Sequence, residues 1–134
     1  HVSRILKPGG MLFVTFPPYH SPYGGHQHLI KNTWGRLPYI HLLPKKIFFR
    51  MIADGKTIDV DEVQRLHSIR LTAKKFITAA QKTGYLLHRE EYYLLRPVFK
   101  MKFGLPTIPI TPLKQVPLVK QVLSLEAAYI LQWK

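Results

Sequence analysis

The amino-acid sequence predicts an α/β fold with a mixed sheet, in which the last strand runs antiparallel to its neighbours. The expected order is helix end, strand, long insertion, helix, strand, connection, short helix and strand. Met11 to Val14 is an apolar run without polar alternation, the pattern of a strand that helices cover on both faces. The last two strands follow each other without a full crossover helix, which suits an antiparallel pair.

The first expected element is the end of a helix around Val2, Ile5 and Leu6. Lys7 precedes a proline and is thereby pushed out of the α region, so the helix must stop there. Gly9 and Gly10 can take positive φ at little steric cost and turn the chain into the strand Met11 to Phe16. Pro17 and Pro18 end that strand because neither can donate to a ladder.

Residues 19–44 are rich in Pro, Gly, His and aromatic residues, and the breakers predict a loop with short helical pieces. Residues 45–53 place apolar side chains at 3–4 spacing, which predicts a short amphipathic helix that stops at Asp54-Gly55. Residues 59–70 predict a turn or two of helix around Val60, Val63 and Leu66, with Ile69 and Leu71 in an extended exit.

Thr72 is the expected N-cap of the next helix, whose buried face holds Ala73, Phe76, Ile77 and Ala80. Gly84 ends this helix at the C′ position. The aromatic and aliphatic content of residues 85–95 then predicts a strand.

A proline-punctuated connection is expected over residues 97–117, followed by a short helix at 118–123 with Pro117 in its first turn. Residues 126–133 predict the last strand, with one face formed by Ala127, Tyr129, Leu131 and Trp133.

Composition suits one domain with a real core: the chain has 134 residues, of which 46% are hydrophobic. It has no cysteine, and no apolar run is long enough to cross a membrane. We therefore expect a cytoplasmic protein without a transmembrane segment.

The net charge is +13, from 20 Lys and Arg against 7 Asp and Glu. Such a balance attracts phosphates, anionic lipid or acidic partners. The basic residues are spread out, and no run of five or more appears. A basic module that binds RNA or a membrane surface without catalysis therefore stays open as the alternative function.

Three segments resemble the class I S-adenosylmethionine-dependent methyltransferases. L-K-P-G-G, the apolar strand and its proline resemble the helix, turn and fifth strand of that family. T-A-K-K-F-I-T-A-A-Q-K-T-G-Y is similar to the helix that leads into the sixth strand, and A-A-Y-I-L-Q-W-K looks like the terminal strand. The resemblance covers nearly the whole chain apart from residues 19–68.

The resemblance implies that residues 1–134 are the carboxyl-terminal part of one Rossmann-like methyltransferase domain. Residues 19–68 would be a substrate-covering insertion, and the reaction would move a methyl group from S-adenosylmethionine to a small-molecule acceptor. The family's glycine-rich turn after a first strand, and its acidic residue at the end of the second, have no counterpart here. We expect them upstream of His1 and expect the isolated chain to be inactive.

Candidate site residues follow the carboxyl end of the strand Met11 to Phe16, where ligands sit in α/β sheets. A histidine can take the proton from an attacking hydroxyl or amine, and His20 and His26 are our candidates for that catalytic role. The candidate substrate contacts are Tyr19, Tyr23, His28 and Trp34. The competing interpretations are a histidine-rich loop that simply packs or is disordered and, for Trp34, a place in the core of the insertion.

Two other side-chain patterns are weaker signals of function. His26-x-His28, with His20 or His41 as a third ligand, would be a metal site, but Gly24-Gly25 indicates a turn there and no carboxylate lies nearby. We predict no metal site. Glu90 and Glu91 are adjacent in a strand and point to opposite faces, so we expect ion pairs with Arg89 or Arg96.

A sheet cut in half would expose an apolar edge, so an oligomer that forms through that edge is also expected. A non-catalytic fragment or degenerate homologue whose sheet serves only assembly is the remaining alternative.

Overall fold

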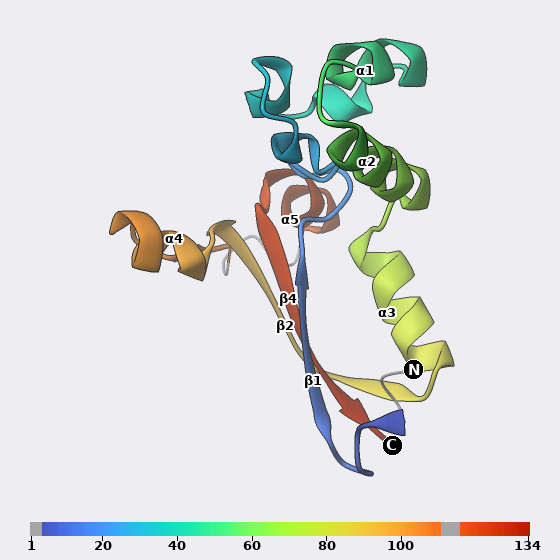
Figure 1. Cartoon of the computed structure of the whole chain (residues 1–134). Helices are drawn as coiled ribbons and strands as arrows, with labels where there is room; N and C mark the ends of the chain where they lie inside the picture. Colours follow the sequence, from blue (N-terminus) through green and yellow to red (C-terminus); the bar gives the residue numbers. More distant parts are fainter. Residues whose placement is uncertain (1–3, 111–115) are drawn as a thin grey trace.

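The computed structural model describes residues 4–110 and 116–134. The chain is a mixed α/β structure with a four-stranded, all-antiparallel sheet in the order β1-β4-β2-β3 (Figure 1). The strands are β1 (Met11–Phe16), β2 (Tyr85–Leu95), β3 (Ile108–Pro109) and β4 (Glu126–Trp133). The helices are α1 (Lys45–Ile52), α2 (Thr57–Ile69), α3 (Ala73–Lys82), α4 (Pro97–Phe103) and α5 (Pro117–Leu123).

The last strand lies in the middle of the sheet, antiparallel to both neighbours. It pairs with β1 from Met11↔Gln132 to Phe16↔Ala127, and with β2 from Tyr85↔Trp133 onward. The register to β2 shifts between Leu87 and Arg89. The prediction of an antiparallel last strand is confirmed. The prediction of a mixed sheet is wrong for the described strands, because β4 lies between β1 and β2 and every pair is antiparallel. Because β1 and β2 both oppose β4, they run in the same direction and end at the same side of the sheet.

Burial along β1 corrects one prediction. Exposed and partly buried residues alternate along the strand, and Met11 and Phe13 are 50% and 67% exposed. The expectation that helices cover both faces is therefore wrong for the described residues. Leu12 and Phe16 pack with residues of α3, and the odd-numbered side chains of the strand point to the opposite face.

The turn before β1 matches its prediction in part. Val2 lies outside the described residues, and Ile5 and Leu6 form a turn and a bend. Gly9 has the expected positive φ of 78°, but Gly10 does not. Gly10 instead donates a backbone hydrogen bond of 2.8 Å to Lys7, and a Cβ there would lie 2.8 Å from the same carbonyl oxygen.

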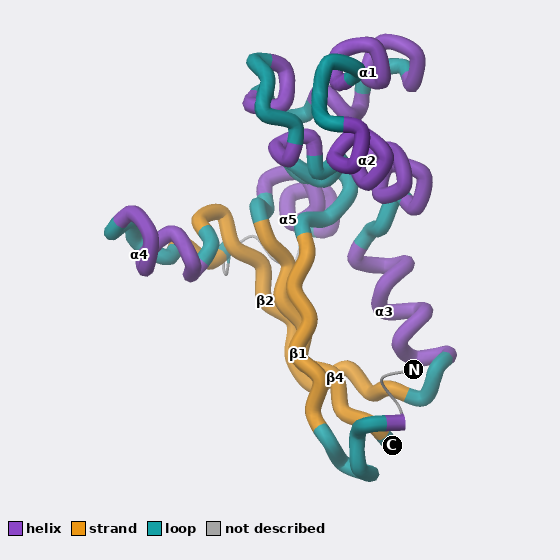
Figure 2. The backbone as a smooth tube through the Cα atoms, in the orientation of Figure 1, coloured by secondary structure: helices purple, strands orange, loops and turns teal. Residues whose placement is uncertain are grey.

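Residues 19–68 fold above the end of β1 as loops and short helices, whereas the strands gather below (Figure 2). The loop carries three 3₁₀ helices, at Gln27–Leu29, Trp34–Arg36 and Ile40–Leu42, as the breakers predicted. This segment has its own core, formed by Ile30, Ile40, Phe48, Ile52 and Val63. Because this core contains only residues of the segment, contacts within the segment stabilise its shape independently of the sheet.

α1 and α3 form where the periodicity predicted them. Thr72 caps α3 by accepting from the backbone N–H of Lys75, and Gly84 follows the helix with φ 92°. α2 is longer than predicted: it begins at Thr57, and it contains Ile69, which we had expected in an extended exit. The left-handed conformation of Arg70, with φ 48°, ends this helix.

The connection after β2 also differs from the expectation. Residues 97–103 form α4, which begins on Pro97 because a proline ring suits the first helical turn. β3 then pairs with the end of β2. α5 occupies the predicted residues, and residues 111–115 of the expected connection lie outside the described part of the chain.

The sheet and α3 share two further clusters of buried residues. Tyr92, Ala127 and Tyr129 are buried from the sheet, and Ala73 and Ala80 from the helix. Within the described residues, no helix is long and apolar enough to cross a membrane.

Candidate functional site

A pocket of about 340 Å³ lies where β1 and β2 end and β4 begins. Four parts of the chain line it: the residue after β1, the insertion, the junction of β2 with α4, and the residue before β4. The lining residues are Pro17, Tyr23, His28, Arg96, Phe99 and Leu125. The pocket thus takes shape only when the sheet and the insertion are both folded.

The insertion loop holds Tyr23 and His28 through hydrogen bonds to backbone carbonyls. The buried Gln27 side chain donates to Pro22 at 2.9 Å and to Leu37 at 3.2 Å. Tyr23 donates its hydroxyl proton to the carbonyl of Arg36 at 2.9 Å. These bonds tie the loop across 5 to 13 residues and orient the two aromatic rings toward each other.

His26 and His28 form a pair of imidazoles at the pocket. Their ring centroids lie 5.9 Å apart, and the ring of Tyr23 stands edge-on to His28 at 5.8 Å. Burial lowers the pKa of His26, and the neighbouring His28 lowers it further, against a smaller opposing effect of Glu62. The pKa of His28 is also lowered, first by burial and then by the charge of Arg96. Both imidazoles are therefore neutral near pH 7 and able to accept a proton.

Arg96 is a functional candidate that the sequence reasoning missed. Its guanidinium lies 4.8 Å from the ring centroid of Phe99, and its Nε is buried without a hydrogen-bond partner among the described residues. Arg96 follows the end of a strand, as Tyr19 to His28 do, and that position was the available signal. We had expected Arg96 to pair with Glu90 or Glu91.

The two glutamates pair with cations other than Arg96. Glu91 accepts from Arg89 at 3.1 Å, as predicted, and Glu90 pairs with Lys120 at 3.3 Å. Glu90 also accepts a hydrogen bond from the hydroxyl of Tyr92 at 3.2 Å. The prediction for Arg96 was therefore wrong, because α5 brings Lys120 to Glu90.

Tyr19 and His20 lie outside the pocket lining. Tyr19 is only 6% exposed, and its hydroxyl lies 3.2 Å from Nε2 of His67. The side chain of His20 is exposed and stands edge-on to Tyr19 at 5.2 Å. Neither His41 nor His67 was singled out with Tyr19, because the tertiary fold alone brings these three together.

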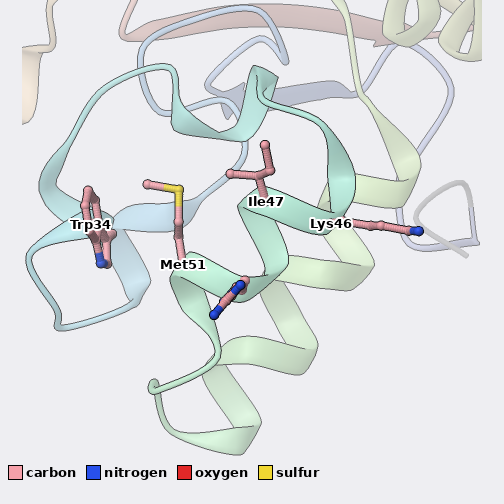
Figure 3. Close-up of a pocket in the computed structure, with 5 residues that line it drawn as sticks. Trp34, Lys46, Ile47 and Met51 are labelled. Carbon is pink, nitrogen blue, oxygen red and sulfur yellow. The ribbon is translucent and has the colours of Figure 1, made fainter.

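Trp34 lies in a different, open groove of about 510 Å³, on the surface of the insertion (Figure 3). It is 48% exposed and faces α1, which supplies Lys46, Ile47, Arg50 and Met51. Trp34 is thus outside the core of the insertion and is separated from Tyr23 and His28, with which the sequence reasoning had grouped it.

The described residues do not fit the role of the main S-adenosylmethionine site. The pair Gly24-Gly25 packs against its own loop: a Cβ on Gly24 would lie 2.2 Å from the carbonyl oxygen of Pro18, and one on Gly25 would lie 2.2 Å from Cβ of His41. Neither glycine leaves room for a cofactor, and among the described residues none that lines the pocket is acidic. Within the described ranges, no group of three His, Cys, Asp or Glu residues could hold a metal ion.

No protein-family model, curated protein or solved structure matches the chain.

Proposed function

We propose that this chain is the carboxyl-terminal part of a class I methyltransferase domain and that it forms the acceptor side of the site. The order β1-β4-β2, with α3 between β1 and β2 along the chain, supports the resemblance noted in the sequence. The observation that carries the proposal is the pocket at the carboxyl ends of β1 and β2, where Tyr23 and His28 meet.

The histidines at this pocket have the state that a general base needs. A neutral imidazole takes the proton from the hydroxyl or amine of an acceptor as that atom attacks. His28 lines the pocket and His26 stands beside it, whereas His20 lies outside the lining. We therefore assign proton acceptance to His28, supported by His26, in preference to His20. Tyr23 forms one wall of the acceptor pocket.

The cofactor is proposed to bind mainly to residues outside this chain, because the described residues do not fit it. Residues 19–68 act as the substrate-covering insertion, and the isolated chain is inactive. No step of the reaction at the methyl donor is assigned to the residues of this chain.

The coding sequence upstream of His1 tests the assignment. A strand, a glycine-rich turn and an acidic residue roughly twenty positions later are expected there. A start codon immediately before His1 would contradict it. Micromolar binding of S-adenosylmethionine to the isolated chain would contradict the placement of the cofactor residues outside it.

Enzyme kinetics of the protein that carries the upstream half test the roles of the histidines. His28→Gln should lower kcat about 100-fold or more, the usual contribution of a general base. His20→Gln and His88→Gln are matched controls and should stay close to wild type. In the wild type, activity should persist below pH 6.5 and fall on further acidification, because the pKa of His28 is lowered. A larger loss from His20→Gln than from His28→Gln would overturn the assignment.

A second candidate function, binding to an anionic membrane surface, is favoured by the groove at Trp34. Trp34, Ile47 and Met51 offer apolar contact, and Lys46 and Arg50 line the same groove. Residues 29–53 contain five Lys and Arg residues and no Asp or Glu. Exposed apolar side chains flanked by cations that can reach lipid headgroups are the pattern of an interfacial surface.

Trp34 makes this function measurable. In a Trp133→Phe background, the fluorescence of Trp34 should shift to shorter wavelength with phosphatidylglycerol-containing vesicles and not with phosphatidylcholine alone. Lys46→Gln/Arg50→Gln should weaken binding about 30-fold, from about 1 kcal/mol per cation. Lys74→Gln/Lys75→Gln on α3 removes the same charge elsewhere and should have little effect. Equal losses from the two pairs, or a preference for single-stranded RNA, would contradict a membrane site.

A further inference from the structure

We propose that the pocket between β1, β2 and the insertion binds the anionic group of a small aromatic acid through Arg96. The proposal rests on the proposed function only in naming that acid as the methyl acceptor. The binding itself depends on the pocket alone.

The first argument is the unused hydrogen-bonding capacity of Arg96. The ion pairs among the described residues join Arg65 to Glu62, Arg89 to Glu91 and Lys120 to Glu90, and none includes Arg96. Its buried Nε lacks a partner in that same part of the chain. A charged donor left without a partner is costly to bury. Arg96 therefore keeps a positive charge that no carboxylate of the described residues neutralises, and its terminal nitrogens remain for an anionic ligand.

The second argument is the charge of the lining. Pro17, Phe99 and Leu125 are apolar, Tyr23 is neutral, and Arg96 is the permanent charge. A guanidinium presents its donors as a planar fork that matches a carboxylate or a phosphate bidentately. Because no described residue of the lining is acidic, an anion is the complementary ligand.

The third argument concerns the shape of the ligand. Phe99 packs against the guanidinium at 4.8 Å and limits its movement, and the rings of Tyr23 and His28 add two flat walls. Ligand pockets commonly have volumes of about 300–1,000 Å³, so 340 Å³ suits a small molecule. A single aromatic ring that carries a carboxylate fits the apolar walls, the volume and the charge.

Binding of such an acid should also be visible at His28. The charge of Arg96 contributes to the lowered pKa of this imidazole. An anion held by Arg96 offsets that charge, so the pKa of His28 should rise when the ligand binds. A merely structural role of Arg96 would not produce this change.

The test compares benzoate with benzamide, which has nearly the same shape and no charge, by calorimetry and by NMR titration of the histidines. Benzoate should bind at least tenfold more tightly than benzamide and should raise the pKa of His28. Phenyl phosphate and inorganic phosphate are the other two ligands to be titrated. Tighter binding of phenyl phosphate than of benzoate would identify a phosphoryl ligand, whereas inorganic phosphate binding as well as phenyl phosphate would overturn the aromatic part of the proposal.

Arg96→Gln should lose at least tenfold in benzoate affinity and abolish the response of His28, while benzamide binding stays unchanged. Arg96→Lys keeps the charge without the fork and should lose less. Arg89→Gln removes an arginine of β2 that is paired with Glu91 and does not line this pocket, and this variant should bind benzoate like wild type. Circular dichroism of each variant shows whether it folds.

Equal binding of benzoate and benzamide, no measurable binding of any probe, or equal losses in Arg96→Gln and Arg89→Gln would overturn the proposal. These experiments need no methyl donor. A start codon directly before His1 would therefore refute the methyltransferase assignment without changing the benzoate result. Failure of benzoate to bind would likewise leave the methyltransferase assignment unchanged.

Discussion

The imidazole of His41 donates a hydrogen bond of 2.6 Å from Nε2 to the backbone carbonyl of Tyr19. The two residues are 22 positions apart, and the bond closes the loop that follows β1. With the proton on Nε2, Nδ1 is the unprotonated nitrogen, and it is buried without a partner among the residues described. His41 is thus held as a neutral side chain inside the insertion.

The first prediction is an acid sensitivity of the fold that originates at His41. Burial lowers its pKa to about 4, and the nearby His67, His20 and His26 act in the same direction, against the raising effect of the bond to Tyr19. The unfolded chain has the ordinary pKa of about 6.5 and so binds more protons than the folded chain between pH 6.5 and 4. Stability should therefore fall as the pH drops, with a loss of roughly 2 kcal/mol between pH 7 and pH 5 from this residue.

Urea unfolding at pH 7 and at pH 5 measures this loss. His41→Gln removes the titrating group and should flatten the pH dependence, although its stability at pH 7 is lower. His88→Gln changes an exposed histidine of β2 and should keep the wild-type pH dependence. An undiminished slope in His41→Gln would show that other groups cause the acid sensitivity.

The second prediction is that removing the hydroxyl of Tyr92 lowers stability more than removing the hydroxyl of Tyr129. The hydroxyls of Tyr92 and Tyr129 lie 3.1 Å apart, and Tyr92 also donates to Glu90. Burial is the main cause that raises the pKa of Tyr129 to about 12. Tyr92→Phe leaves the hydroxyl of Tyr129 buried without its partner and should cost about 1–3 kcal/mol, whereas Tyr129→Phe leaves Tyr92 bonded to Glu90 and should cost less.

Chemical denaturation of the two variants decides this order. Tyr93→Phe removes a hydroxyl from the same strand at a partly exposed position and should change stability by less than about 0.5 kcal/mol. Equal losses of stability in Tyr92→Phe and Tyr129→Phe would mean that the hydrogen bond to Glu90 does not satisfy the hydroxyl of Tyr92.

The third prediction concerns the close approach of Gly25 to His41. An alanine Cβ at position 25 would lie 2.2 Å from Cβ of His41, which belongs to a fully buried side chain. Gly25→Ala should therefore destabilise the chain by about 1–3 kcal/mol or more, the range of an overpacked interior. Thermal unfolding measures the cost.

Gly104→Ala is the control for Gly25→Ala. A Cβ at Gly104 would meet nothing within 4 Å, so its cost should come only from the positive φ of 68°, about 1 kcal/mol. A wild-type melting temperature in Gly25→Ala would contradict the packing of this loop against His41.

The fourth prediction is the contribution of the N-cap of α3. The hydroxyl of Thr72 accepts from the backbone N–H of Lys75 at 3.3 Å. Thr72→Ala should cost about 1 kcal/mol because that N–H loses its partner. Thr78→Ala, at an exposed position of the same helix, should be neutral or slightly stabilising, since alanine has the higher helix propensity. Urea unfolding of the pair separates capping from propensity, and equal effects would remove the capping role.

The candidate site could be predicted from the sequence only in part. The strand end after Phe16 pointed to the loop that supplies Tyr23 and His28, and both line the pocket. Arg96 and Phe99 were missed, because α4 lies in a segment whose prolines indicated a connection. Trp34 was grouped with the wrong neighbours: it is close to them in sequence, but the 3₁₀ helices turn it toward α1.

The sequence by itself determined the elements whose signals are local. The spacing of apolar residues, the cap at Thr72 and the breaks at Pro17 and Gly84 specify β1 and α3 within a residue or so, because backbone hydrogen bonding and chain stiffness act over a few positions. The tertiary structure alone decided which face of β1 is covered, which cation meets Glu90, and that Tyr19, His41 and His67 share one buried cluster. Those outcomes depend on contacts between residues tens of positions apart, and neither periodicity nor spacing along the chain encodes such contacts.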